Sequence, residues 1–145
     1  MTRYLRWSIV AACALLLQYA GSPSPRVGNI AKCGPTNRVL VAVTQVERAL
    51  GIQQELDFLG TDGMLFVYSA PQRPSFWLRD THIPLGIVFF DPEYRVIGTA
   101  EMLPYTTKRY VPTAPIIAAL EVRATINVRI AYPIGTRCEI TLPIR

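Results

Sequence analysis

The sequence is poor in charged and in metal-binding residues, and these shortages limit the classes of function that it can have. Charged residues make up 17 % of the 145 residues, and the chain has one histidine and three cysteines. One histidine and widely separated cysteines cannot supply the usual zinc spacings, so we predict no metal site. The basic residues are scattered along the chain despite a net charge of +5. A nucleic-acid partner is therefore not expected, because it requires a clustered basic surface.

Several catalytic and cofactor motifs are also missing. The chain contains no P-loop, no dinucleotide fingerprint and no G-x-S-x-G nucleophile motif. We therefore predict no cofactor. An enzyme is the less favoured interpretation, although the sequence leaves the question open.

The first 22 residues have the pattern of a targeting segment. Arg3 and Arg6 precede the apolar run Ser8–Leu17, and small residues and chain breakers follow. The apolar run is shorter than the roughly 20 residues of a membrane-spanning helix. Residues 1–22 are thus predicted to be a signal peptide, with an uncleaved N-terminal anchor as the alternative. Both alternatives predict an extracytoplasmic protein, periplasmic or secreted, that contacts the membrane only through this segment.

Two cysteines, Cys33 and Cys138, lie beyond the predicted signal peptide. An oxidising compartment permits them to pair. Cys33 precedes the first predicted strand and Cys138 lies in the last one, and such strands are often neighbours in a sheet. The two residues are therefore a candidate disulfide, with two unpaired thiols as the alternative.

The rest of the chain is predicted to be a linker, residues 23–37, followed by one β-rich domain, residues 38–145. Short apolar runs with many β-branched and aromatic residues predict strands. These runs are 38–43, 63–69, 75–79, 86–91, 95–103, 116–122 and a last strand near the C-terminus. The pattern predicts a mainly β (α+β) fold, a small, partly open antiparallel β-barrel with one or two short helices.

One short helix, residues 45–50, is predicted from its boundaries. Thr44 and Glu47 have the spacing of a capping box, and Gly51 is a natural stop. Val46, Ala49 and Leu50 would pack on the sheet. Residues 124–132 fit either a strand or a helical turn.

The stretch SFWLRDTHIP, residues 75–84, concentrates chemically versatile side chains. Strand alternation places Trp77 and Arg79 on one face, where they can form a cation–π contact. Asp80, Thr81 and His82 follow at the strand end. This composition is typical of a cleft for a small polar or anionic ligand, with the proline-rich loop 104–115 as its lip. The alternative is plain surface, with Arg79 and Asp80 as an exposed ion pair.

Glu121 is unusual because it lies within the apolar run IIAALEV, residues 116–122. A carboxylate there must face solvent, a cation or a polar cleft, since an unpaired buried charge is costly. We therefore include Glu121 in the candidate ligand-binding set, after Trp77, Arg79, Asp80 and Thr81. A hydrolase or lyase using Asp80, His82 or Glu121 is one alternative. A structural or partner-binding domain without a pocket is another. The favoured prediction is a small-ligand binding or accessory module of the cell envelope, with an unknown small polar ligand or envelope partner.

These segments also resemble a known family. GMLFV, SFWLRDTHIPLGIVFFD, ALEV and IGTR occur in the order found in the domain of unknown function 192 family of small, often exported prokaryotic proteins. The resemblance implies a compact β-rich, barrel-like domain without an established activity. It also implies a helical turn at the start of 124–135. The family's characteristic residues fall on Gly63, Met64, Phe66, Phe76, Trp77, Thr81, Pro84, Leu85, Asp91 and Glu121.

The chain departs from the family mainly at polar positions. Arg79 and Asp80 stand where Lys–Asn is usual, Gly86 stands where Asp is usual, and Arg123 stands where Asn is common. Gly51–Gln53 likewise replaces the usual Gly–Leu–Met. These differences leave the fold expectation intact but change the polar groups that a shared ligand would meet.

Overall fold

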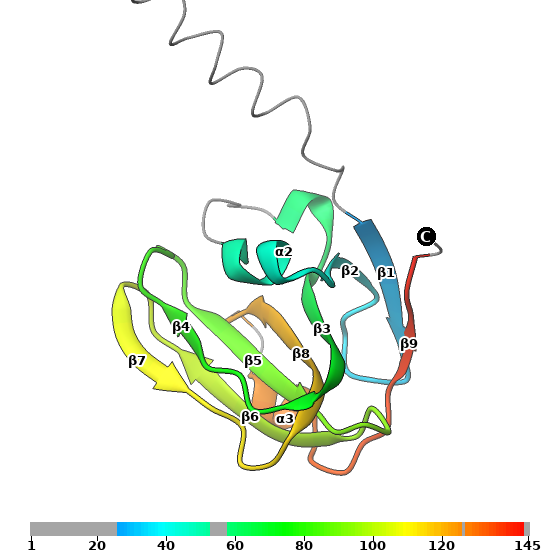
Figure 1. Cartoon of the computed structure of the whole chain (residues 1–145). Helices are drawn as coiled ribbons and strands as arrows, with labels where there is room; N and C mark the ends of the chain where they lie inside the picture. The colour runs from blue at the N-terminus through cyan, green and yellow to red at the C-terminus, as the bar shows by residue number, and fades with distance from the viewer. Residues whose placement is uncertain (1–25, 53–57, 126, 144–145) are drawn as a thin grey trace, which may run out of the picture.

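A computed structural model describes residues 26–52, 58–125 and 127–143 of the chain (Figure 1). The described part is mostly strand with a few short helical segments. In chain order these are β1 (Arg26–Ala31), β2 (Arg38–Ala42), α2 (Gln45–Leu50), the 3-10 turn η1 (Phe58–Gly60), β3 (Gly63–Gln72), β4 (Phe76–Leu78), β5 (Leu85–Phe90), β6 (Val96–Met102), β7 (Thr106–Tyr110), β8 (Ile116–Arg123), α3 (Val128–Ala131) and β9 (Glu139–Thr141). The prediction of a mainly β fold with short helices is confirmed.

Seven strands form one sheet in the order β6-β5-β8-β3-β2-β1-β9, and β4 and β7 form a separate two-stranded sheet. All pairs are antiparallel except β2 and β3, which are parallel because the connection through α2 crosses over between them. One isolated bridge, Arg95 with Arg137, links the two ends of the sheet. Among the described residues β6 and β9 do not otherwise pair, so the sheet is not closed into a barrel.

Two strands lie where the sequence predicted irregular chain. β1 falls inside the predicted linker and pairs with both β2 and β9, so the sheet begins at Arg26 and the linker prediction is wrong there. The cause is visible at Gly28, where a Cβ would lie 2.9 Å from the Thr141 carbonyl oxygen. The glycine that indicated a linker is required for close strand packing. Similarly, β7 lies inside the predicted loop 104–115 and pairs with β4.

The predicted signal peptide or anchor, residues 1–22, lies outside the described residues. Within residues 26–52, 58–125 and 127–143, no helix combines the length and apolarity needed to cross a membrane.

The capping box of α2 is confirmed, but its packing face is not as predicted. The Thr44 side chain accepts from the Glu47 backbone N–H at 3.2 Å, and Glu47 accepts from the Thr44 backbone N–H at 2.8 Å. Val46 and Leu50 are 69 % and 62 % exposed. The helix is instead attached by Glu47, which pairs with Arg26 of β1 at 2.7 Å. Burial alone would raise the pKa of Glu47, but the backbone donors and Arg26 lower it to about 2.

The seven-stranded sheet has a separate core on each face, because alternate side chains of a strand point to opposite faces. In β8, Leu120 and Val122 belong to the first core and Ala119 to the second. The first core contains the Cys33–Cys138 disulfide and residues from β1, α3 and the segment before β9. The second contains residues from β4 and β7. We call these the disulfide core and the ribbon core.

The segment 124–132, left open between strand and helix, contains the helical turn α3. Asn127 caps it by accepting from the Ile130 backbone N–H. Val128 of α3 packs on Gly86 of β5 so closely that a Cβ there would lie 2.2 Å from Val128 Cγ1. A larger residue at Gly86, including the family's usual Asp, therefore does not fit this arrangement.

Candidate functional site

A pocket of ≈ 280 Å³ opens on the ribbon-core face, between α2, the 75–81 segment and the sheet. We call it the Glu121 pocket. Its described lining comes from α2 and the residues just after it, and from β3, β4, β7 and β8. The residues are Arg48, Ala49, Leu50, Gly51, Ile52, Phe66, Ser75, Phe76, Trp77, Leu78, Thr81, Arg109 and Glu121. Of the five ligand-binding residues predicted from the sequence, the pocket thus brings together Trp77, Thr81 and Glu121.

Glu121 lies on the central strand β8, between Met64 of β3 and Ile87 of β5 in the strand register. Its side chain points to the ribbon-core face and the residue is 4 % exposed. No described residue forms a hydrogen bond or ion pair with its carboxyl group. Burial raises the pKa of Glu121 to about 8. The carboxyl group is therefore mostly protonated at neutral pH, and it can donate a hydrogen bond as well as accept one.

Thr81 and Trp77 occupy opposite ends of the short 77–81 stretch. Thr81 is 4 % exposed, and its backbone carbonyl accepts from the Tyr105 N–H at 3.1 Å. That bond ties the end of β4 to the start of β7. The Thr81 hydroxyl has no hydrogen-bond partner among the described residues, so it is available to a molecule in the pocket. Trp77 is half-buried at the pocket wall.

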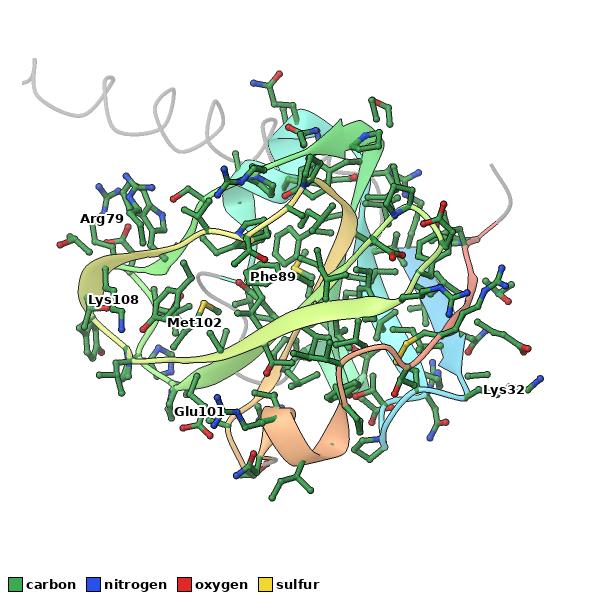
Figure 2. All side chains as sticks on the ribbon, turned by 90° about the horizontal axis from the view of Figure 1, so that it is seen from below. Lys32, Arg79, Phe89, Glu101, Met102 and Lys108 are labelled. Atoms are coloured by element: carbon green, nitrogen blue, oxygen red, sulfur yellow. A yellow bond between two sulfur atoms is a disulfide. The ribbon has the colours of Figure 1, made fainter. Side chains whose placement is uncertain are left out.

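The predicted cation–π contact is present, with the Arg79 guanidinium carbon 4.8 Å from the Trp77 ring centroid. Arg79 itself does not line the pocket. It forms an ion pair with Asp80 at 3.1 Å, and both side chains are more than half exposed. Figure 2 shows Arg79 and Lys108 lying together at the β4–β7 end of the molecule. For Arg79 and Asp80 the structure therefore matches the alternative interpretation, an exposed ion pair.

The acid–base combination considered for an enzyme is not assembled. His82 is exposed, and neither His82 nor Asp80 is among the described residues that line the pocket with Glu121. In the described ranges, no group of three or more His, Cys, Asp or Glu residues is arranged to hold a metal ion.

Sequence reasoning missed two arginines, Arg48 of α2 and Arg109 of β7. Arg48 Nη1 donates to the carbonyl oxygens of Val43 and Val67, at 2.5 and 2.9 Å, and its guanidinium lies 4.8 Å from the Tyr68 ring. The guanidinium carbon of Arg109 lies 3.1 Å from the Trp77 ring centroid. The segment predicted as a lip thus reaches the pocket from a strand. Strand alternation in 106–110 could have indicated Arg109, but Arg48 requires the crossover through α2.

The pKa of Tyr68, in β3, is affected by the charges of both Arg48 and Glu121. Burial raises its pKa, Arg48 lowers it and Glu121 raises it, with a net value of about 12. Tyr68 is thus an uncharged phenol under physiological conditions.

A larger depression, of ≈ 630 Å³, lies at the other end of the sheet and is lined by Tyr94 and residues around Cys138. Its charged side chains are exposed, and two of them, Lys32 and Glu139, form an ion pair at 2.6 Å. Lys32 lies far from Arg79 and Lys108 in Figure 2. The described lining of this depression contains no buried charged side chain comparable with Glu121.

Comparison with known protein families assigns the chain to one of them. The family model of DUF192, described as an uncharacterised group, matches residues 29–140. The chain therefore belongs to the domain of unknown function 192 family. The match begins within β1, which supports counting β1 as part of the domain. No curated protein matches the chain significantly.

Two solved structures are similar. One is a candidate transcription regulator from Sinorhizobium meliloti 1021, with 20 % identity, a TM-score of 0.71 and coverage of 83 % of this chain and 98 % of that one. The other is a protein of unknown function from Novosphingobium aromaticivorans, with 28 % identity, a TM-score of 0.63 and coverage of 79 % and 83 %. The first likeness, at this identity, shows the fold alone.

Proposed function

We propose that this protein is a binding module for a small polar ligand, which occupies the Glu121 pocket. The observation that carries the proposal is the carboxyl group of Glu121, which belongs to a residue only 4 % exposed, faces the pocket and has no hydrogen-bond partner among the described residues. Among the described residues no fully enclosed side-chain oxygen or nitrogen lacks a hydrogen-bond partner, so the carboxyl oxygens of Glu121 are open to the pocket. A ligand in the pocket would supply the hydrogen bonds that no described residue makes to them.

The composition of the lining supports the same conclusion. Apolar walls from Phe66, Phe76 and Leu78 surround a few polar groups, and that is the usual make-up of a small-molecule site. The volume of ≈ 280 Å³ suits a metabolite-sized molecule rather than a polymer. No second polar group among the described lining residues is placed to share acid–base chemistry with Glu121, so binding is favoured over catalysis.

We further propose that the module acts outside the cytoplasm. Support comes from the basic and apolar pattern of residues 1–22 and from the Cys33–Cys138 disulfide, since disulfides persist mainly in oxidising compartments. Mass spectrometry of the protein from fractionated cells tests this proposal. Recovery of the reduced chain in the cytoplasmic fraction would contradict it.

Tryptophan fluorescence tests the binding proposal directly. The chain has two tryptophans, Trp7 and Trp77, so the variant Trp7→Phe makes the pocket tryptophan the sole emitter. Glucose, propionate, propylamine and inorganic phosphate are titrated in turn as probes of different charge. At least one is expected to change the Trp77 emission with saturation.

Two further variants locate the effect. Thr81→Val removes a pocket hydroxyl with little change in shape and should weaken the saturable response. Asp80→Asn changes a neighbouring residue outside the pocket and should leave it unchanged. If no probe gives a saturable response, or if the response survives Thr81→Val undiminished, the binding proposal is wrong.

A further inference from the structure

The polar groups of the Glu121 pocket are predominantly hydrogen-bond donors. Arg48 and Arg109 can only donate, and the Thr81 hydroxyl can donate. In its protonated form Glu121 donates as well. Arg48 already donates from Nη1 to the carbonyl oxygens of Val43 and Val67, and a ligand that meets the remaining donors must be rich in acceptors.

The two arginines of the lining lack carboxylate partners. The described residues form three ion pairs, Arg26–Glu47, Lys32–Glu139 and Arg79–Asp80, and neither Arg48 nor Arg109 takes part in them. Among the described lining residues, the net charge is therefore positive at neutral pH. Such a concave positive surface attracts anions by focusing the local field.

Trp77 acts in this pocket as a support for guanidinium groups. Arg109 lies 3.1 Å and Arg79 4.8 Å from the ring centroid. A sugar would need an open indole face for stacking, and Arg109 already lies in contact with the ring. The indole instead holds Arg109 in place at the pocket, where its N–H groups can meet an anion.

The apolar surface of the pocket favours an organic anion over an inorganic one. Phe66 and Phe76 lie edge to face at 5.4 Å and contribute to the walls beside Glu121, together with Ile52. Inorganic phosphate or sulfate would leave this surface without contacts. A carbon chain ending in a carboxylate would cover it.

From these observations, and resting on the proposed binding function, we infer that the ligand is a small organic carboxylate, bound by Arg109, Arg48 and the side chain of Glu121. The Glu121 O–H donates to one ligand oxygen, and the ligand remains an anion. When Glu121 starts ionised, one proton is taken up from solvent and bonds to its carboxylate as the complex forms. No covalent bond between protein and ligand is made or broken.

This arrangement has a defined pH dependence. Among the described residues, the elements around Glu121 carry a few other charged or titratable groups, and the adjacent residue of β5 is Ile87. These groups are Glu47 and Arg48 of α2, Tyr68 of β3, Lys108, Arg109 and Tyr110 of β7, and Arg123 of β8 itself. The arginines remain charged and the pKa of Tyr68 is about 12, so Glu121 is the group that titrates between pH 7 and pH 9. Its pKa of about 8 predicts that carboxylate affinity falls roughly tenfold across this interval, because an ionised Glu121 repels the ligand.

Three probes of nearly equal size test the inference on the Trp7→Phe chain: propionate, propionamide and propylamine. Propionate is expected to bind at least tenfold more tightly than the other two at pH 7. Calorimetry in two buffers of different ionisation enthalpy should show proton uptake on propionate binding at pH 8.5. In Glu121→Gln the affinity for propionate should become independent of pH, because the amide keeps a donor and cannot ionise.

Arg109→Gln should lower the affinity for propionate at least tenfold, while Lys108→Gln, which changes a neighbouring residue outside the pocket lining, should have little effect. Preference for propylamine with proton release would overturn the carboxylate inference while leaving a binding pocket. Equal binding of propionate and propionamide, or tighter binding of glucose or inorganic phosphate, would do the same. If none of the probes binds, both the inference and the binding function fail.

Discussion

On one side of β8, Leu120 and Val122 pack into the disulfide core; on the other side, Ala119 packs into the ribbon core and Glu121 faces a pocket. The disulfide core includes a buried Tyr132 whose hydroxyl is hydrogen-bonded to Thr36, and the Cys33–Cys138 disulfide, which spans 105 residues. Burial raises the pKa of Tyr132, and its polar atom is nevertheless satisfied. The carboxyl group of Glu121 has no comparable partner.

The comparison indicates a division of tasks between the two faces of one sheet. In the disulfide core, a covalent bond joins the segments next to β1 and β9 and the buried Tyr132 hydroxyl has a partner, which favours stability. The ribbon core is covered by a two-stranded ribbon and by a helix with exposed Val46 and Leu50, and it leaves Thr81 and Glu121 lining a pocket. A few polar groups in a mostly apolar pocket are the usual make-up of a ligand-binding site.

Of the changes considered, removal of the disulfide is expected to lower the free energy of unfolding the most. The double variant Cys33→Ala, Cys138→Ala should lower the free energy of unfolding by about 4–5 kcal/mol in the chain-entropy model for a loop of this size. Denaturant unfolding measures it, and reductant added to the unmodified chain is the control. An unchanged midpoint would show that the disulfide core does not depend on this bond.

Leu120→Ala probes the packing of the disulfide core. Leu120 is completely buried, so the substitution removes apolar contacts and leaves a cavity. We expect a loss of about 2–5 kcal/mol in the free energy of unfolding. Leu103→Ala, at a residue that is 60 % exposed, is the matched control and should change stability by about 0.5 kcal/mol or less. Similar losses in both variants would contradict the assigned core.

Glu121→Gln tests how much the ionisation of Glu121, on the ribbon-core face, lowers the free energy of unfolding. The folded-state pKa is raised from an ordinary 4.5 to about 8, so the folded protein binds the proton more tightly than the unfolded chain. The stability of the unmodified chain should therefore fall as pH rises between about 4.5 and 8, and level off above 8. The total change is on the order of a few kcal/mol.

The glutamine variant should lose this contribution to the pH dependence and be the more stable protein at pH 8. Unfolding midpoints at pH 5 and pH 8 measure it, with Asp80→Asn as the exposed control that keeps the dependence. A wild-type protein whose stability rises through this interval would argue against a buried, unpartnered carboxyl group.

Thr44→Ala is the smallest change and tests the attachment of α2 beside the pocket. It removes the side-chain oxygen that accepts from the Glu47 N–H, and the loss of an N-cap costs about 1 kcal/mol. Thr125→Ala, at an exposed turn residue, should cost less. Thermal unfolding distinguishes the two variants. Equal midpoints would mean that the capping box adds nothing to the stability of the domain.

Much of the fold follows from local patterns. The apolar run at β5 predicts a strand with both faces covered, and all six of its residues are buried. The box of Thr44 and Glu47 predicts the start of α2. These features depend on neighbours within a few residues, which is why they can be read without knowing the fold. The exposed face of α2 could not be predicted, because it depends on where the crossover places the helix.

The candidate site was predictable only in part. Trp77, Thr81 and Glu121 drew attention by composition, and they line one pocket. Arg79 and Asp80 did so by the same criterion, yet they form an exposed ion pair. Strand alternation near a strand end does not distinguish the mouth of a pocket from the adjacent surface. Arg109 lay in a segment whose prolines indicated a loop, and it joins the site because β7 pairs with β4.

The sequence by itself determined that the chain folds as a mainly β domain of the domain of unknown function 192 family, with a carboxyl group in the middle of an apolar strand. Strand periodicity and caps are local, so the residues specify them directly. Tertiary structure alone decided that Glu121 faces a pocket beside Arg48 and Arg109, and that the strand formed by Arg26–Ala31 pairs with the last strand. Those outcomes depend on contacts between residues far apart in the chain, which no local pattern encodes.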